Sequence, residues 1–416
     1  MLLCIPQKFF LQKRNSKKCI AHVLIVCISC ADRKITAGTG GGAGYNRYMK
    51  VLILSSNNGG GHNSVSAALK ECFILHGDAA EIRDSLSFIS DTVSDVISFS
   101  HIFMYRHLPA LQNNAYFNTE KKDEIFQEER LLRRFINLGQ TNLGRLIQER
   151  GYDAVVCTHV FGAMMLTEAV KNFDLKVRTA IVETDYCNTP GSSNNEMDHH
   201  FVAYDGLIPE LISQGVPEKT IVISGIPVRS QIFRHLEKPI AKHLLGIPED
   251  HDHILMMGGS MGCGPISELL EILHRRLDEN TDISVVCGTN TKMKHEMDER
   301  YTDCRKIHIF GYMPDMSWIY SASDIFVTKP GGICTTEAAM LGLPMVLVSV
   351  VGACEQFNLN YFTDNGGALT GNDENELADC CEELLLNREK RAAISAKLPQ
   401  LVHADAAEII YENIKK

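Results

Sequence analysis

The sequence lacks a long hydrophobic run, an excess of basic residues and a second CxxC motif to match its single one. No stretch of this 416-residue chain approaches the roughly 18 consecutive apolar residues of a membrane-spanning helix. The formal net charge of −10 argues against a general nucleic-acid binder, which would carry a basic face. Cys27 and Cys30 form a CxxC pair that has no matching second pair, which disfavours a structural zinc site. The other cysteines are scattered, as is typical of small core residues.

Two common nucleotide-binding motifs are also absent near the first globular strand. Three glycines at 59–61 follow an apolar strand expected over residues 51–54. Because no Lys-Ser/Thr pair follows these glycines, the loop is not a P-loop, and it also lacks the GxGxxG spacing of dinucleotide-binding folds. Three consecutive glycines still let another group approach the backbone closely.

What the sequence does contain is a repeated alternation of short apolar strands with helices. This alternation predicts an α/β fold with parallel sheets in two doubly wound halves. We expect residues 1–48 to be a disordered extension outside the fold, or the result of a mis-assigned start. The domains expected after it are an N-terminal Rossmann-like domain over 49–225, a second one over 226–390, and a C-terminal helix at 391–416 that packs back toward the first.

Several polar residues follow the expected strands directly. Ligands of such sheets bind beyond the carboxyl ends of the strands, where His62, His159 and Asp185 are expected. In the second half, a strand at 324–328, a turn at 329–332 and a helix capped by Thr335 predict a place where an anion can bind.

Five motifs, in order, resemble the monogalactosyldiacylglycerol synthase and processive diacylglycerol glycosyltransferase family. They are the glycine loop at 59–62, the stretch at 225–229, the glycine loop at 258–262, the segment at 329–344 and residues 355–358. The resemblance extends from about residue 49 to the end of the chain. It implies a GT-B fold, in which two Rossmann-like domains face a central cleft. The lipid-II-forming N-acetylglucosaminyltransferase is a more distant relative with the same plan.

The resemblance also implies an activity. The expected reaction transfers a hexose from UDP-glucose or UDP-galactose to diacylglycerol, with inversion and without a metal or other cofactor. The expected partners are the UDP-sugar and diacylglycerol at a membrane surface, with no nucleic acid, and the expected location is cytoplasmic with peripheral membrane contact. Two alternatives remain open: a UDP-N-acetylglucosamine transferase acting on a lipid-linked cell-wall precursor, and a non-catalytic nucleotide-sugar-binding protein.

Site residues follow from the same resemblance. His62 is the expected base, since a helix N-terminus keeps an imidazole neutral. Asp185 would orient it, contact the acceptor or cap the next turn, and His159 has the same alternatives. Glu337 would accept hydrogen bonds from both ribose hydroxyls. Asn57 stands where plant members of the family carry an aspartate, so the base is His62 or remains open. The other expected contacts fall into two sets: Gly259, Ser260, Gly262, Tyr312, Met313, Gly331, Gly332, Thr335, Gln356 and Asn358 for the nucleotide sugar, and Asn57, Gly60, Gly61 and His159 for the acceptor.

Three further features have plainer interpretations. Residues 250–252 imitate a DxD metal motif, but they precede their strand and would lie at the wrong edge of the sheet. Residues 198–200 look like a metal cluster, but adjacent strand histidines point to opposite faces. The nearly uncharged, aromatic segment at 85–119 is either a core helix or a surface that touches lipid.

Overall fold

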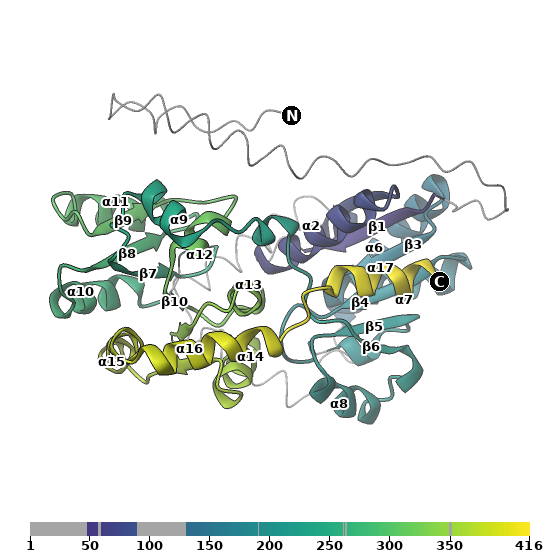
Figure 1. Cartoon of the computed structure of the whole chain (residues 1–416). Coiled ribbons are helices and arrows are strands. Elements are labelled where there is room, and N and C mark those ends of the chain that lie inside the picture. The colour runs from purple at the N-terminus through teal and green to yellow at the C-terminus, as the bar shows by residue number, and fades with distance from the viewer. Residues whose placement is uncertain are drawn as a thin grey trace, which may run out of the picture. The chain divides into compact units, whose positions relative to one another are not determined.

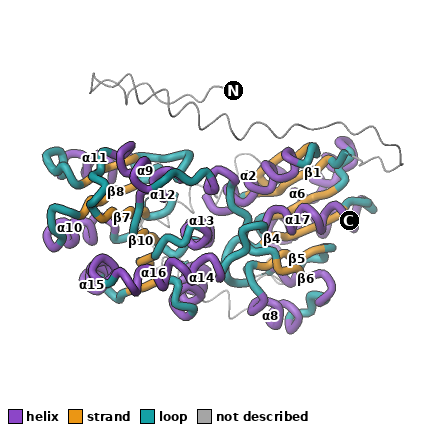
Figure 2. The backbone as a smooth tube through the Cα atoms, viewed as in Figure 1, coloured by secondary structure: helices purple, strands orange, loops and turns teal. Residues whose placement is uncertain are grey.

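The computed structural model describes residues 48–56, 60–89, 130–189, 191–260, 262, 264–348 and 352–416 (Figure 1). Apart from Tyr48, the extension expected at 1–48 lies outside these residues, and so does most of the aromatic segment at 85–119. The described chain contains two six-stranded sheets, and all of their strand pairs are parallel. Figure 2 shows the strands in orange among purple helices.

The first sheet has the strand order β2-β1-β3-β4-β5-β6. Its strands are β1 (Lys50–Ser55), β2 (Ala79–Asp84), β3 (Ala154–Cys157), β4 (Arg178–Val182), β5 (His199–Val202) and β6 (Ile221–Ile223). The second sheet has the order β12-β11-β10-β7-β8-β9. Its strands are β7 (Asp252–Met257), β8 (Thr281–Val286), β9 (Ile307–Phe310), β10 (Ile325–Thr328), β11 (Met345–Leu347) and β12 (Ala368–Thr370).

Helices connect the strands in the manner required for parallel pairing. The first half holds α2 (Gly60–Leu75), α6 (Arg130–Arg150), α7 (Val160–Phe173) and α8 (Ile208–Ser213). The second half and the C-terminus hold α9 (Lys238–Leu245), α10 (Ile266–Arg276), α11 (Thr291–Arg300), α12 (Ser317–Ala322), α13 (Gly332–Met340), α14 (Ala353–Asp364), α15 (Glu374–Leu386), α16 (Arg388–Lys397) and α17 (Ala406–Lys415). Short 3₁₀ turns are η2 (Ser85–Phe88), η3 (Ser192–Asn194), η4 (Asp205–Leu207), η5 (Glu218–Thr220), η6 (Ser230–Phe233) and η7 (Leu398–Gln400).

Alternating residues of β1 bury both faces of the first sheet. Val51 and Ile53 belong to a core cluster that includes residues of α2, whereas Leu52 and Leu54 belong to a second cluster with residues of α6 and α7. All four side chains are fully buried. A strand that is covered on both faces needs a continuous apolar sequence, which explains the unbroken run that begins at Val51.

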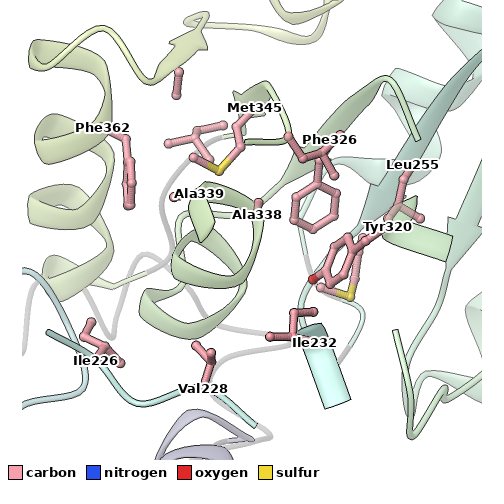
Figure 3. Packing of buried hydrophobic residues seen from close by; sticks show 14 of the residues in the cluster. Ile226, Val228, Ile232, Leu255, Tyr320, Phe326, Ala338, Ala339, Met345 and Phe362 are labelled. Carbon is pink, nitrogen blue, oxygen red and sulfur yellow. The ribbon is translucent and has the colours of Figure 1, made fainter. Parts of the chain in front are cut away.

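The core of the second half centres on α13. Ala338 and Ala339 of this helix lie among Phe326 of β10, Met345 of β11 and Phe362 of α14, and all five residues are buried (Figure 3). Two small side chains allow α13 to lie close to the sheet. The start of α13 is thereby held firmly at the carboxyl end of β10.

Both sheets reverse their strand order at one point. In the first sheet, the chain runs to β2 on one side of β1 and to β3 on the other, and in the second sheet β7 has β8 on one side and β10 on the other. Crevices of open parallel sheets form at such points, beyond the carboxyl ends of the strands. The loops that follow β1 and β3, and those that follow β7 and β10, therefore lie at the places where ligands of this fold class bind.

Two helix starts differ from the sequence-based expectation. We expected residues 55–64 to be a loop, but α2 begins at Gly60, so His62 lies in its first turn. We also expected Thr335 and Thr336 to cap the next helix, but α13 begins at Gly332, and both hydroxyls donate back to carbonyls of Gly331 or Gly332. The capping expectation was wrong because a threonine hydroxyl inside a helix can also bond to a carbonyl one turn earlier.

The C-terminal helix α17 packs against α2, beside the first sheet (Figure 1). The rings of Phe73 and Tyr411 lie 5.4 Å apart, and the Lys415 ammonium lies 3.0 Å from the buried carboxylate of Asp78. The guanidinium of Arg178, at the start of β4, donates to the Ile414 carbonyl at 2.8 Å. The end of the chain therefore stabilises elements from its beginning.

Candidate active site

A cleft of about 910 Å³ is lined by residues from the carboxyl-end loops of both sheets. Its lining includes the first turn of α2, the loops after β3 and β4, the glycine loop after β7 and the first turns of α13 and α14. Twelve of the residues expected from the sequence line this cleft: Gly60, Gly61, His62, His159, Asp185, Gly259, Ser260, Tyr312, Met313, Gly331, Gly332 and Glu337. The structure thus brings together residues that lie almost 280 positions apart in the sequence.

His62 lies on α2, and its Nδ1 is 2.7 Å from the Thr158 carbonyl oxygen and 3.3 Å from the Thr184 hydroxyl. A carbonyl only accepts, so Nδ1 carries the proton and Nε2 is the basic nitrogen. Burial lowers the pKa of His62 below its ordinary value, and the Asp185 carboxylate and the Thr158 hydrogen bond partly offset this effect. The imidazole is therefore neutral near neutral pH and able to take a proton.

Asp185 and His159 surround this base. Asp185 Oδ2 accepts from the Thr184 hydroxyl at 3.3 Å, and that hydroxyl also contacts His62. The His159 ring lies edge-on to the His62 ring, with centroids 4.7 Å apart, and its Nδ1 accepts from the Phe161 amide at the start of α7. His159 thus has a capping role in the fold as well as a place in the cleft.

The glycine loop after β7 faces the same space. Gly259 has a φ of +69°, and a Cβ at this position would overlap the side chain of Lys329. Ser260 is exposed at the cleft, and a Cβ on Gly60 of α2 would come within 2.5 Å of its hydroxyl. Gly259 therefore lets the Lys329 side chain approach the backbone closely, and Gly60 does the same for the loop that carries Ser260.

Glu337 lies one turn into α13, with its carboxylate at the cleft. The Tyr320 hydroxyl donates to Glu337 Oε2 at 3.2 Å. Burial raises the pKa of Glu337 to about 7, although the Tyr320 hydrogen bond and the nearby Arg229 guanidinium act in the opposite direction. Tyr312, which is 62% exposed, and Met313 line the same part of the cleft.

Some expected contacts lie elsewhere. Gly262, Thr335, Gln356 and Asn358 are not among the residues that line the cleft. Gln356 is exposed on α14 and donates to Asn360, whereas Asn358 is fully buried and hydrogen-bonded to both halves of the chain. Asn57 falls outside the described residues.

Two cations of the cleft were missed in the sequence. Lys329 follows β10 directly, and its ammonium lies 2.6 Å from the Glu355 carboxylate, with both side chains largely buried. Arg229 donates to the Gln231 amide oxygen at 2.6 Å and lies 3.6 Å from Glu71. A lysine directly after a buried strand was the available signal, but we interpreted it as turn punctuation.

The acidic motif at 250–252 lies away from the cleft. Asp252 begins β7, at the opposite end from the glycine loop, and pairs with Arg391 at 2.9 Å. His251 pairs with Asp282 at 2.7 Å. Across the described residues, the group whose potential ligand atoms lie within 4.8 Å of one another is Cys72 of α2, His76 just after α2 and Glu408 of α17, and none of the three lines the cleft.

Comparisons with known proteins agree with this arrangement. Residues 62–228 match the monogalactosyldiacylglycerol (MGDG) synthase family, and residues 260–400 match the group 1 glycosyl transferases. The chain is a glycosyltransferase whose first half is similar to the monogalactosyldiacylglycerol synthases. The first match covers the half that contains His62, and the second covers the half that contains Glu337.

Two relatives match over most of their length. The processive diacylglycerol β-glucosyltransferase of Bacillus subtilis (strain 168) is 26% identical over 374 residues, which are 89% of this chain and 96% of that protein. The protein of the same name from Bacillus mycoides (strain KBAB4) is 27% identical over 370 residues, or 88% of this chain and 93% of that one.

Solved structures show the same fold. The chain matches Acinetobacter baumannii MurG with a TM-score of 0.61 and 17% identity, covering 88% of this chain and 99% of that one. It matches the Neisseria meningitidis UDP-GlcNAc 2-epimerase, solved with UDP-GlcNAc bound, with a TM-score of 0.59 and 14% identity, covering 88% and 99%. The chain therefore has the GT-B fold that its motifs imply. Among its described helices, none has the length and apolar character needed to cross a bilayer.

Proposed function

We propose that this enzyme transfers a hexose, with glucose as the first candidate, from a UDP-sugar to the hydroxyl of diacylglycerol. The relatives that match this chain nearly end to end are named processive diacylglycerol β-glucosyltransferases. The observation that carries the proposal is the placement of a neutral His62 across one cleft from Ser260 and Glu337.

The reaction needs a base, because an alcohol is a weak nucleophile at neutral pH. The Nε2 atom of His62 takes the acceptor's hydroxyl proton as the oxygen forms its bond to the anomeric carbon. The bond from that carbon to the diphosphate breaks at the same time, and UDP leaves with the electron pair. Attack from the side opposite to UDP inverts the anomeric configuration. Asp185 stabilises the imidazolium that results, because its charge favours the protonated ring.

The second half holds the donor in this proposal. Backbone and hydroxyl donors of Gly259 and Ser260, with the start of α13 at Gly331 and Gly332, contact the diphosphate. The Lys329 ammonium supplies the positive charge that opposes the charge on the leaving group. We therefore propose that no divalent metal is required. Glu337 accepts from the ribose hydroxyls, and the Tyr312–Met313 backbone contacts the uracil edge.

The first half presents the acceptor. Gly60 and Gly61 line the cleft with His62 and His159, and we place the diacylglycerol hydroxyl beside them. Diacylglycerol resides in a bilayer, so we propose that the enzyme acts from the cytoplasmic side in peripheral contact with the membrane surface.

The test is a matrix of donors and acceptors with products identified by mass spectrometry. UDP-glucose, UDP-galactose and UDP-N-acetylglucosamine are each incubated with diacylglycerol vesicles and with a lipid-linked muramyl peptide acceptor, in the presence and absence of a chelator. We expect hexosyl-diacylglycerol that forms equally well with chelator. Product only on the muramyl acceptor would favour the cell-wall alternative, and complete loss with chelator would contradict the metal-independent mechanism.

His62→Ala is the matched variant. It should abolish product while UDP affinity, measured by calorimetry, changes little, because the donor contacts lie in the other half of the chain. Near-normal turnover in this variant would remove His62 as the base. UDP binding without turnover on any acceptor, in the unmodified enzyme, would instead indicate a nucleotide-sugar-binding protein.

A further inference from the structure

Asn358 of α14 is fully buried and joins the two halves of the chain through its amide. Its Oδ1 accepts from the Tyr186 backbone amide at 2.7 Å. Its Nδ2 donates to Asp185 Oδ1 at 2.7 Å and to the Pro330 carbonyl oxygen at 2.9 Å. The amide orientation is fixed by these partners, because a backbone N–H must donate and a carbonyl must accept. Both donor hydrogens of the side chain are therefore in use.

The same helix carries donor-side groups of the cleft. Cys354 and Glu355 in the first turn of α14 line the cleft, and Glu355 holds the Lys329 ammonium at 2.6 Å. Asn358 lies one helical turn beyond them. One turn of α14 thus links Glu355, which pairs with Lys329, to Asn358, which binds Asp185 of the first half.

Asp185 in turn faces the base. Its second oxygen accepts from the Thr184 hydroxyl, which lies 3.3 Å from His62 Nδ1. Gly332 at the start of α13 packs on the same loop, where a Cβ would come within 2.9 Å of Asp185 Oδ1 and closer still to the Thr184 carbonyl oxygen. The carboxylate is therefore held from the second half of the chain, although it belongs to the first.

We propose that Asn358 is a positioning residue that fixes the Asp185 carboxylate toward His62, and that it does so only when the two halves are closed. This inference rests on the transferase proposed above, in which His62 is the base. It assigns Asn358 a different task from the nucleotide-sugar contact that its motif implied. The donor-side helix α14 thereby prepares the base of the acceptor half, so proton removal is coupled to closure around the donor.

The charge environment predicts the direction of the effect. Besides Asp185, the charged and histidine side chains that line the cleft with His62 are Glu183, His159, Arg229, Glu337 and the Lys329–Glu355 pair. Asp185 is the group whose charge raises the pKa of His62. Releasing Asp185 from Asn358 should therefore lower the pKa of His62 and weaken the stabilisation of the imidazolium.

The experiment uses Asn358→Ala in the full-length chain, with Asn360→Ala as the control. Asn360 is exposed on the same helix, so its replacement should leave all readouts unchanged. Hydrogen bonds to charged groups and the alignment of catalytic groups suggest that kcat should fall roughly 10- to 100-fold in Asn358→Ala. UDP affinity should stay within about twofold, and the acid limb of kcat/KM and the His62 titration in imidazole ¹⁵N NMR spectra should both move to lower pH.

Three comparisons decide the outcome. Asp185→Asn should shift the His62 titration in the same direction, and the double variant Asn358→Ala/Asp185→Asn should show no further shift. The exchange Asn358→Asp with Asp185→Asn keeps a hydrogen bond between residues 358 and 185, but it moves the charge and removes the donor to the Pro330 carbonyl, so it should not recover kcat. Recovery of kcat by this exchange would reduce Asn358 to a structural contact, and a large loss of UDP affinity in Asn358→Ala would restore the ligand-contact role.

These readouts separate the two proposals. If the unmodified enzyme formed no glycolipid from any donor, the transferase proposal would fail while the His62 titration could still shift as expected. If glycolipid formed normally and Asn358→Ala left both kcat and the titration unchanged, the positioning role alone would be overturned.

Discussion

At the scale of single residues, Glu337 offers a test that needs no turnover. Its pKa of about 7 means that the side chain is partly protonated near neutral pH in the free enzyme. An ionised carboxylate accepts hydrogen bonds from both ribose hydroxyls, whereas the protonated form has less acceptor capacity. Ribose binding should therefore lower the pKa of Glu337, and affinity should rise as pH increases from about 6 to 8.

Uridine is the appropriate ligand for this test, because it has no phosphate that titrates in the same range. Calorimetry should show tighter uridine binding at higher pH, with proton release near pH 7. Glu337→Gln should weaken binding about 10- to 100-fold at pH 8 and remove most of the pH dependence. Unchanged affinity in Glu337→Gln would show that the ribose is held by other residues.

Much of the cleft could be predicted from residue types and their order. His62 and Asp185 were expected at strand ends, Ser260 and Glu337 were implied by the family resemblance, and the structure places all four around one cleft. Asn358 and Gln356 were grouped as one motif, yet one is buried between the halves and the other is exposed. A motif gives the order of residues along a helix, but which of them faces the cleft depends on how that helix packs.

At the scale of elements, the close contact at the start of α13 makes Gly332 sensitive to a single methyl group. A Cβ there would overlap the Thr184 carbonyl oxygen, which is backbone and cannot rotate away. Gly332→Ala should therefore displace α13 from the loop that holds Asp185. Because a shift of about 1 Å can cost roughly 100-fold in rate, kcat/KM should fall by about that factor.

Gly311→Ala is the control for this substitution, because the added Cβ would meet the Lys294 side chain at 3.5 Å, an ordinary contact. UDP affinity in Gly332→Ala should also fall, because the start of α13 contacts the diphosphate in our proposal, but by less than kcat/KM, since the other donor contacts move with the same half. Activity in Gly332→Ala equal to that in Gly311→Ala would mean that the two halves do not need this contact during transfer.

The strands were easier to predict than the helix starts. Long apolar runs marked β1, β7 and β10 because a doubly covered parallel strand must be apolar throughout. Two strands were not predicted from the sequence: β2, in which no residue is fully buried, and β12, which has three residues. Both lie at the edge of a sheet, where pairing with the neighbouring strand stabilises the extended backbone, so their own sequences indicate a strand only weakly.

At the scale of the whole molecule, the contact between α17 and α2 ties the last residues to the base-bearing helix. Ile414 is fully buried beneath this contact, and its carbonyl oxygen accepts from Arg178. The helix that it supports begins at Gly60 and carries His62 in its first turn. Loss of packing at the C-terminus should therefore reach the cleft, although no residue of α17 lines it.

Ile414→Ala tests this connection. Removing a fully buried isoleucine side chain should cost about 2–5 kcal/mol of stability, which would appear as a lower midpoint of chemical denaturation. Hydrogen exchange should become faster in α2, and activity should be lost at lower temperature than in the unmodified enzyme. Glu412→Ala on the exposed side of α17 is the control, with an expected change within about 0.5 kcal/mol. If Ile414→Ala loosened α17 alone and left exchange in α2 unchanged, the C-terminal helix would be a passive cover and would not support the base.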